Sequence, residues 1–174
     1  TSLRRYLYGM RLHQWLKNVL VFLPLMPVLH ALSSALLLNG VLAFFAFGLA
    51  ASAVYIVNDL LDLQSDRLHH RKRSRPFAAG EISVPRGLAL ATGLALASLT
   101  LSLLFLPNVF LWVLLFYVAL TTAYSLFLKR RAVVDVFSLA GLYTVRVAAG
   151  TAATGQPLSF WILSFSLFIF LSLA

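Results

Sequence analysis

The stretch LLLNGVLAFFAFGLAASAVYIVNDLLDLQSD, residues 36–66, decides the class of fold. Residues 36–61 are apolar over more than the length of about 20 residues that a helix needs to cross a bilayer. The three acids of the stretch, Asp59, Asp62 and Asp66, all lie near its end. An apolar helix that becomes acidic at its end indicates a membrane-spanning helix with a polar site at one membrane surface.

The composition of the whole chain is that of a membrane protein. Of its 174 residues, 61% are hydrophobic and 11% are charged, and the mean hydropathy is +0.91, whereas soluble domains are about half apolar and a quarter charged. Apolar stretches predict about six spans, at residues 15–38 (interrupted), 36–61, 84–106, 109–128, 133–153 and 159–174. Pro24 and Pro27 should shorten or kink the first of them. The chain is therefore predicted to be an all-α, polytopic transmembrane helical bundle, with residues 1–174 in one domain.

The basic residues lie on one side of the predicted bundle. The chain has 14 Lys and Arg against 5 Asp and Glu, a net charge of +9. Apart from Arg146, they fall before the first span, between the second and third, and between the fourth and fifth, while the alternate loops carry none. By the positive-inside rule, the N-terminus and the basic loops are predicted to face the cytoplasm, and the protein to lie in the cytoplasmic membrane. The positive surplus needs no nucleic acid to explain it. Because the chain has no cysteine, disulfides, thiolate nucleophiles and cysteine-ligated metals are excluded.

The acids at the end of the second span carry the functional signal. If this helix continues, Asn58, Asp62 and Asp66 are spaced i, i+4, i+8 and share one face. Carboxylates stacked near a helix C-terminus repel one another and the helix dipole, so a compensating cation is expected. Hard oxygen ligands without thiolates suit Mg²⁺. The simpler alternative is a solvated helix end that nearby arginines neutralise.

A basic loop follows the acids directly. Arg71, Arg73 and Arg75 could grip a diphosphate beside the metal, because guanidinium groups match phosphate oxygens. The alternative is a loop that only sets the orientation of the protein in the membrane. His69 and His70 are interpreted as loop residues that are neither ligands nor bases.

Four further residues give weaker signals. Tyr124 and Lys129 close the fourth span at the predicted cytoplasmic surface, where an interfacial tyrosine and an orienting lysine are also ordinary. Asp135 opens the fifth span and could pair with Arg130 or Arg131. Arg146 lies deep in an apolar segment and either snorkels to the outer surface or faces a polar cavity.

The motif Asn58-Asp59-x-x-Asp62-x-x-x-Asp66, followed by Arg71-x-Arg73-x-Arg75-Pro76 and Ala79-Gly80, resembles the first aspartate-rich motif of the UbiA-type intramembrane prenyltransferase superfamily. Tyr124 and Lys129 are similar to a Tyr/Lys element of that superfamily, and the resemblance covers essentially the whole chain. It implies a fold of about nine helices with a second aspartate-rich motif between later spans. Residues 1–174 are therefore expected to be the N-terminal part of such a fold.

The segment Met10-Arg11-Leu12-His13-Gln14-Trp15-Leu16-Lys17-Asn18 looks like the polyprenyl-phosphate (decaprenyl-phosphate) phosphoribosyltransferase branch. That likeness implies transfer of 5-phosphoribose from phosphoribosyl diphosphate to a polyprenyl phosphate. Lys72 and Glu81 differ from common choices in the aromatic branch. One alternative is transfer of a prenyl group from a prenyl diphosphate to an aromatic or other acceptor. An alternative of another class is a non-enzymatic ion or lipid transporter subunit, which would spread its polar residues near the membrane midplane.

The resemblance also implies roles for individual residues. It implies Mg²⁺ as the cofactor, held by Asn58, Asp62 and Asp66 with Asp59 in support. The catalytic candidates are Asp62, Asp66, Tyr124 and Lys129. The substrate-binding candidates are Lys17, Asn18, Arg71, Arg73 and Arg75, with Lys17 and Asn18 expected to supply extra donors for a ribose phosphate near the cytoplasmic mouth.

Overall fold

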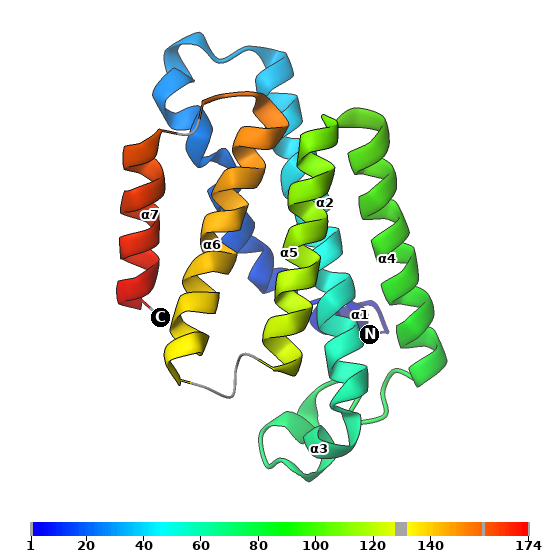
Figure 1. Cartoon of the computed structure of the whole chain (residues 1–174). Coiled ribbons are helices and arrows are strands. Elements are labelled where there is room, and N and C mark those ends of the chain that lie inside the picture. The colour runs from blue at the N-terminus through cyan, green and yellow to red at the C-terminus, as the bar shows by residue number, and fades with distance from the viewer. Residues whose placement is uncertain (1, 128–131, 158, 174) are drawn as a thin grey trace.

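The computed structural model describes residues 2–127, 132–157 and 159–173, and all regular structure in these residues is helical (Figure 1). The predicted all-α class is confirmed. In chain order the elements are α1 (Ser2–Gly9), the 3₁₀ helix η1 (Leu12–Ala31), α2 (Ser34–Leu61), α3 (Leu63–Leu68), the 3₁₀ turn η2 (Lys72–Ser74), α4 (Val84–Phe105), α5 (Asn108–Leu126), α6 (Ala132–Thr154) and α7 (Phe160–Leu173).

The helix lengths agree with the predicted spans. Five described helices, η1, α2, α4, α5 and α6, are long and apolar enough to cross a membrane, and α7 is a shorter apolar helix. The uncertain boundary between the first two spans falls at Ser33, whose Oγ accepts a hydrogen bond from the Leu36 amide, 3.2 Å away. This is an ordinary N-cap, since the side chain satisfies an amide that has no partner within the helix. The kink expected at the two prolines is present too. The segment η1 is a 3₁₀ helix, and Val28 inside it has non-helical dihedral angles.

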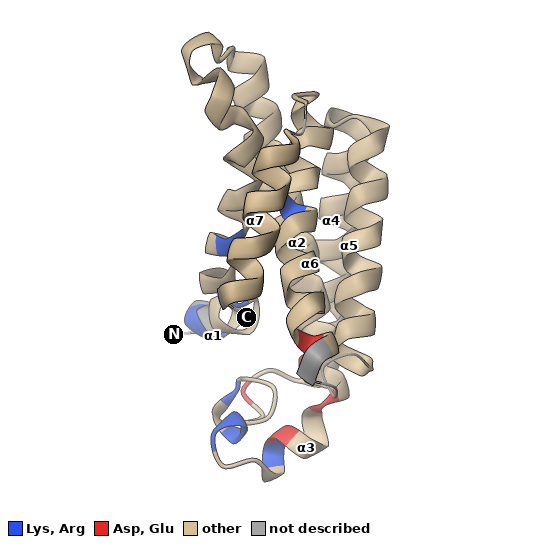
Figure 2. Cartoon of the chain, turned by 60° about the vertical axis from the view of Figure 1, so that its left-hand side comes forward, with Lys and Arg blue, Asp and Glu red and all other residues tan. Residues whose placement is uncertain are grey.

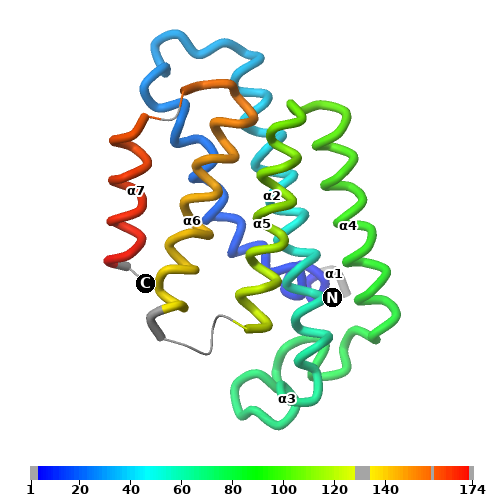
Figure 3. The backbone as a smooth tube through the Cα atoms, viewed as in Figure 1, coloured from blue at the N-terminus to red at the C-terminus, as the bar shows by residue number. Residues whose placement is uncertain are grey.

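Helix α2 lies at the centre of the packing and contacts η1, α4, α5 and α6. Figure 3 shows α4, α5, α6 and α7 running side by side, with α2 and η1 packed against them. The buried face of α2 is rich in alanine and carries Phe47, whose ring lies 4.7 Å from that of Tyr117 and 5.9 Å from that of Phe110 on α5. Small residues on α2 let its neighbours approach closely, which is how helices associate in lipid.

A close approach between η1 and α6 sets the geometry of the interior. A Cβ placed on Gly150 would overlap the carbonyl group of Val21 and would come within 3.1 Å of the Pro24 ring. Helix α6 therefore passes η1 at backbone distance, which only glycine permits at this position. One turn earlier on α6, Arg146 is brought opposite Asn18 of η1, and this pair forms part of the site described below.

Most of the charged residues gather at the end of the bundle that carries α1, α3 and η2, while a few basic positions lie further along the helices (Figure 2). This one-ended distribution is what the sequence pattern predicted. The assignment of that end to the cytoplasm follows from the positive-inside rule and stays a prediction.

Candidate active site

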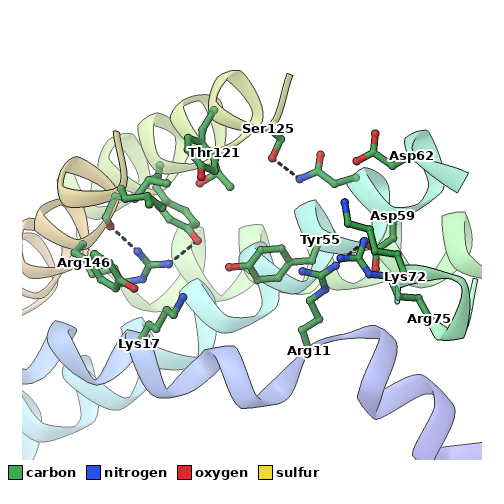
Figure 4. Close-up of a pocket in the computed structure, with 16 residues that line it drawn as sticks. Arg11, Lys17, Tyr55, Asp59, Asp62, Lys72, Arg75, Thr121, Ser125 and Arg146 are labelled. Carbon is green, nitrogen blue, oxygen red and sulfur yellow. Dashed lines mark hydrogen bonds and ion pairs between the residues drawn. The ribbon is translucent and has the colours of Figure 1, made fainter. Parts of the chain in front are cut away.

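A cavity of about 390 Å³ opens between η1, α2, α5 and α6 and takes in the start of the basic loop (Figure 4). Six of the predicted site residues line it: Lys17, Asn58, Asp59, Asp62, Arg75 and Tyr124. It also takes in residues to which sequence reasoning gave no role in the site, notably Arg11, Tyr55, Lys72, Thr121, Tyr143 and Arg146. Residues more than 130 positions apart thus meet in one polar space inside an apolar bundle.

The acids do not share one face of a continuous helix, and that expectation is wrong. Helix α2 ends at Leu61, and Asp62 has φ −86° and ψ 7° before α3 begins. Beyond this break Asp66 turns away from the cavity and is 2% exposed, while Asn58 and Asp62 line it. The physical reason is charge pairing, because the bend lets Asp66 reach a cation instead of stacking beneath other carboxylates.

Arg75 is the cation on which two of the acids converge. Its Nη1 lies 3.2 Å from Asp59 Oδ1 and 2.7 Å from Asp66 Oδ2. Lys72 Nζ adds a longer contact of 3.9 Å to Asp66. The simpler sequence interpretation, in which arginines neutralise the helix end, therefore agrees with the ion pairs of this structure. Arg71 and Arg73, the other arginines expected at the site, are exposed on the same loop and do not line the cavity.

Arg11 is the second partner of Asp59, with Nη2 2.6 Å from Oδ1, and its guanidinium carbon lies 5.2 Å from the centre of the Tyr55 ring. It adopts the left-handed backbone conformation, φ 52° and ψ 48°, between α1 and η1. Such a conformation costs a residue with a side chain about 1–3 kcal/mol and is kept where surrounding contacts require it. Sequence spacing gave no sign of this pair, because the two residues are 48 positions apart.

Asn58, Asp59 and Asp62 form the acidic end of the cavity, and their oxygen atoms fit Mg²⁺. Asn58 donates through Nδ2 to Ser125 Oγ at 2.8 Å, which leaves its amide oxygen as an acceptor. With Asp59 and Asp62 it supplies hard oxygen atoms only, and Mg²⁺ is usually held by one or two carboxylates plus substrate phosphates. No cluster of three or more His, Cys, Asp or Glu residues forms a ready metal cage in the described part of the chain. A metal bound here would therefore need oxygens from its substrate.

The opposite end of the cavity is built around Arg146, which faces the polar interior and not the outer surface. It is 4% exposed. It donates through Nε to Asn18 Oδ1 at 3.0 Å, through Nη1 to the Leu142 carbonyl at 2.6 Å and through Nη2 to the Tyr117 hydroxyl at 3.0 Å. The sequence leaves both possibilities open for Arg146, because its only signal is the depth of this residue in an apolar segment.

Lys17 lies at this same end, with Nζ 5.6 Å from the centre of the Tyr143 ring, over which Arg146 also lies at 5.6 Å. Figure 4 shows Lys17 and Arg146 separated from Asp59, Asp62 and Lys72 by Tyr55. Lys17 therefore shares a cavity with the acids, as expected, but lies at the end beyond Tyr55. Asn18 is buried and does not line the cavity, and it acts through its hydrogen bond from Arg146.

Tyr124 lines the cavity from α5 and donates its hydroxyl hydrogen to Asp135 Oδ1 on α6, 2.7 Å away. This contact accounts for the carboxylate at the start of the fifth span. Lys129, and the arginines 130 and 131 that were considered as partners of Asp135, lie outside the described residues.

Comparisons with known proteins agree with this architecture. Residues 19–174 match the model of the UbiA prenyltransferase family. The chain is 44% identical over 174 residues to the uncharacterized protein y4nM of Sinorhizobium fredii, covering 97% of this chain and 33% of that protein. It is 40% identical over 162 residues to decaprenyl-phosphate phosphoribosyltransferase of Mycobacterium tuberculosis, covering 89% of this chain and 52% of that protein. The chain thus spans a third to about half of these relatives.

The fold is also found among solved structures. A UbiA homolog from Archaeoglobus fulgidus, solved with DMAPP and Mg²⁺ bound, superimposes with a TM-score of 0.76 at 22% sequence identity. The match covers 97% of this chain and 61% of the other. At this level of identity the likeness concerns the arrangement of the helices.

Proposed function

The chain belongs to the UbiA prenyltransferase family, and we propose that the protein is an intramembrane transferase that moves 5-phosphoribose from phosphoribosyl diphosphate to a polyprenyl phosphate. The observation that carries this proposal is the cavity, in which carboxylates and guanidinium groups meet at one end and further cations lie at the other. The relative from M. tuberculosis, whose name states this class of activity, supports it.

The proposed reaction requires a diphosphate to leave from the anomeric carbon of the ribose. Negative charge then develops on the leaving group, and positively charged or hydrogen-bonding groups placed there in advance stabilise the transition state. Arg11, Lys72 and Arg75 lie at the acidic end of the cavity and are the proposed contacts for the diphosphate oxygens. Arg71 and Arg73 stay proposed as outer contacts, because they lie on the loop that carries Arg75.

We propose Asn58, Asp59 and Asp62 as the residues that would hold Mg²⁺, which would neutralise charge on the leaving diphosphate. Asp66 is held by Arg75 in this structure. If phosphate oxygens drew Arg75 away from Asp66, this carboxylate would keep only the 3.9 Å contact to Lys72 and could turn to the metal. The ion pairs to Arg75 and Lys72 would thus keep this carboxylate compensated until the donor arrives.

Tyr124 and Lys129 stay proposed as groups near the reacting atoms. Tyr124 is oriented by Asp135 and stands beside Ser125, the partner of Asn58. Its position lets it contact a diphosphate held by the proposed metal ligands. The surrounding helices would exclude water, which would otherwise capture the electrophilic carbon.

Transfer of a prenyl group is the second candidate, and it is favoured by the solved structure of a relative with DMAPP. The polar lining of the cavity favours phosphoribose. Lys17, Thr121 and Arg146 carry polar groups deep into the bundle, where an allylic chain would need apolar walls. Family membership disfavours a transporter subunit.

A donor comparison tests the proposal. Membranes that contain the protein at its natural length are given radiolabelled phosphoribosyl diphosphate or a radiolabelled prenyl diphosphate, with Mg²⁺ and polyprenyl phosphate. We expect label in the lipid from the phosphoribosyl donor, and about 100-fold less of it with Asp62→Asn. Label that reaches an acceptor only from the prenyl diphosphate would contradict the proposal and support prenyl transfer.

A further inference from the structure

Arg146 presents an unusual charge balance. A charged side chain inside a membrane-spanning helix is costly, and such residues face polar cavities and mark functional sites. The described hydrogen-bond partners of Arg146 are all neutral: an amide oxygen, a main-chain carbonyl and a phenol. Among the described residues, no carboxylate lies within ion-pair distance of it. Its positive charge is oriented by the protein but not neutralised.

Lys17 adds a second cation to the same end. Its ammonium group and the Arg146 guanidinium both lie over the ring of Tyr143, and the described ion pairs of the chain include neither residue. The acids Asp59 and Asp62 stand at the other end of the cavity, beyond Tyr55 (Figure 4). Two cations of like charge on one wall are unfavourable together unless an anion joins them.

Two polar atoms without a described partner lie in or behind this wall of the cavity. The hydroxyl of Thr121 lines the cavity, belongs to a residue that is 5% exposed, and has no hydrogen-bond partner in the described structure. Nδ2 of Asn18, whose oxygen accepts from Arg146, has none either. A buried donor without a partner costs free energy, so the Thr121 hydroxyl in the cavity beside two cations favours binding of an acceptor there.

We propose that the inner end of the cavity, formed by Lys17, Arg146 and Thr121, is a binding site for a phosphomonoester, separate from the diphosphate site at the acidic end. A phosphomonoester carries between one and two negative charges and three strong acceptor oxygens. These oxygens match a guanidinium, an ammonium and a hydroxyl. The inference rests on the proposed function in one respect: both of its substrates carry such a group, the 5-phosphate of the donor and the phosphate of the lipid.

A binding experiment on the purified protein at its natural length tests this site. Two probes, ribose 5-phosphate and geranyl phosphate, are titrated into the wild type, Lys17→Gln and Thr121→Val. Inorganic diphosphate with Mg²⁺ probes the acidic end in parallel. Arg86→Gln is the matched control, because it removes an exposed positive charge at the start of α4, outside the cavity. Arg146→Gln would remove three buried hydrogen bonds and could unfold the protein, so the test rests on the other two residues.

The proposal predicts that at least one phosphomonoester binds to the wild type and that Lys17→Gln weakens it about tenfold, as expected for a charge-assisted hydrogen bond. Diphosphate binding should stay within about twofold, and Arg86→Gln should change neither. Thr121→Val separates binding from packing: it should weaken phosphomonoester binding severalfold while the melting temperature stays equal or rises, since an unpartnered hydroxyl is removed.

Each outcome decides between defined possibilities. Lys17-dependent binding of ribose 5-phosphate identifies the donor as the source of the phosphate, and Lys17-dependent binding of geranyl phosphate identifies the lipid. Failure of both probes to bind, or equal binding to the wild type and Lys17→Gln, overturns the site. The two proposals can fail independently. If no label is transferred from phosphoribosyl diphosphate but Lys17-dependent binding persists, the proposed function is wrong and the phosphomonoester site stands.

Discussion

Replacing Gly150 with alanine tests the contact that places Arg146 in the cavity. The added Cβ would overlap the Val21 carbonyl, and a main-chain atom cannot move aside as the end of a flexible side chain can. Overpacking of this kind costs about 1–3 kcal/mol, and a backbone neighbour argues for the upper end. Alanine recovers about 1 kcal/mol through its higher helix propensity. We therefore expect Gly150→Ala to destabilise the protein by about 2 kcal/mol.

Gly141 on the same helix supplies a matched control. A Cβ placed there has no other atom within 4 Å, so Gly141→Ala should be neutral or stabilising by up to about 1 kcal/mol. Both variants are compared with the wild type by thermal melting and by denaturant titration in the same detergent. Because the overlap would push α6 away from η1, Gly150→Ala should also weaken phosphomonoester binding. Equal stability of the two variants would refute the close approach of α6 and η1.

Three further perturbations have defined outcomes. Asp62→Asn should lower turnover about 100-fold, as expected when a group that stabilises transition-state charge is lost. Chelation of Mg²⁺ should abolish wild-type turnover reversibly. Activity that survives both changes would show that the reaction needs no metal. Tyr124→Phe loses the hydrogen bond to Asp135 and should lower kcat/KM about tenfold. An unchanged kcat/KM would mean that Tyr124 is only an aromatic residue at the membrane surface. In this cysteine-free chain, Ser74→Cys should react with a membrane-impermeant thiol reagent only after cells are opened and Asn108→Cys in intact cells, and the reverse pattern would invert the topology.

The helices were predictable because their signals are local. Residues 84–106 and 109–128 are apolar runs separated by Pro107, and the structure places α4 and α5 there, ending at Phe105 and Leu126. Long uniform runs of this kind define spans without knowledge of the rest of the chain. The Asn58–Asp62 motif was visible for the same reason, since its residues are close together in the sequence.

Contacts between distant segments could not be predicted in this way. The pairing of Arg11 with Asp59 joins the turn between α1 and η1 to α2, and no periodicity of either segment encodes it. The bend at Asp62 was missed because it depends on the capture of Asp66 by Arg75, a tertiary interaction that overrides the tendency of the helix to continue. Arg146 stood out by its depth, but only the approach of η1 at Gly150 decides which way it faces.

The most direct test of the account is the equilibrium binding of phosphoribosyl diphosphate to the purified protein, with and without Mg²⁺. The account predicts that binding requires the metal. It also predicts that Arg75→Gln weakens binding at least about tenfold, because a charge-assisted contact to the diphosphate is lost, while Arg86→Gln leaves it unchanged. Binding that is independent of Mg²⁺, or that is equal in the wild type and Arg75→Gln, would contradict the claim that the acidic end of the cavity holds the donor diphosphate.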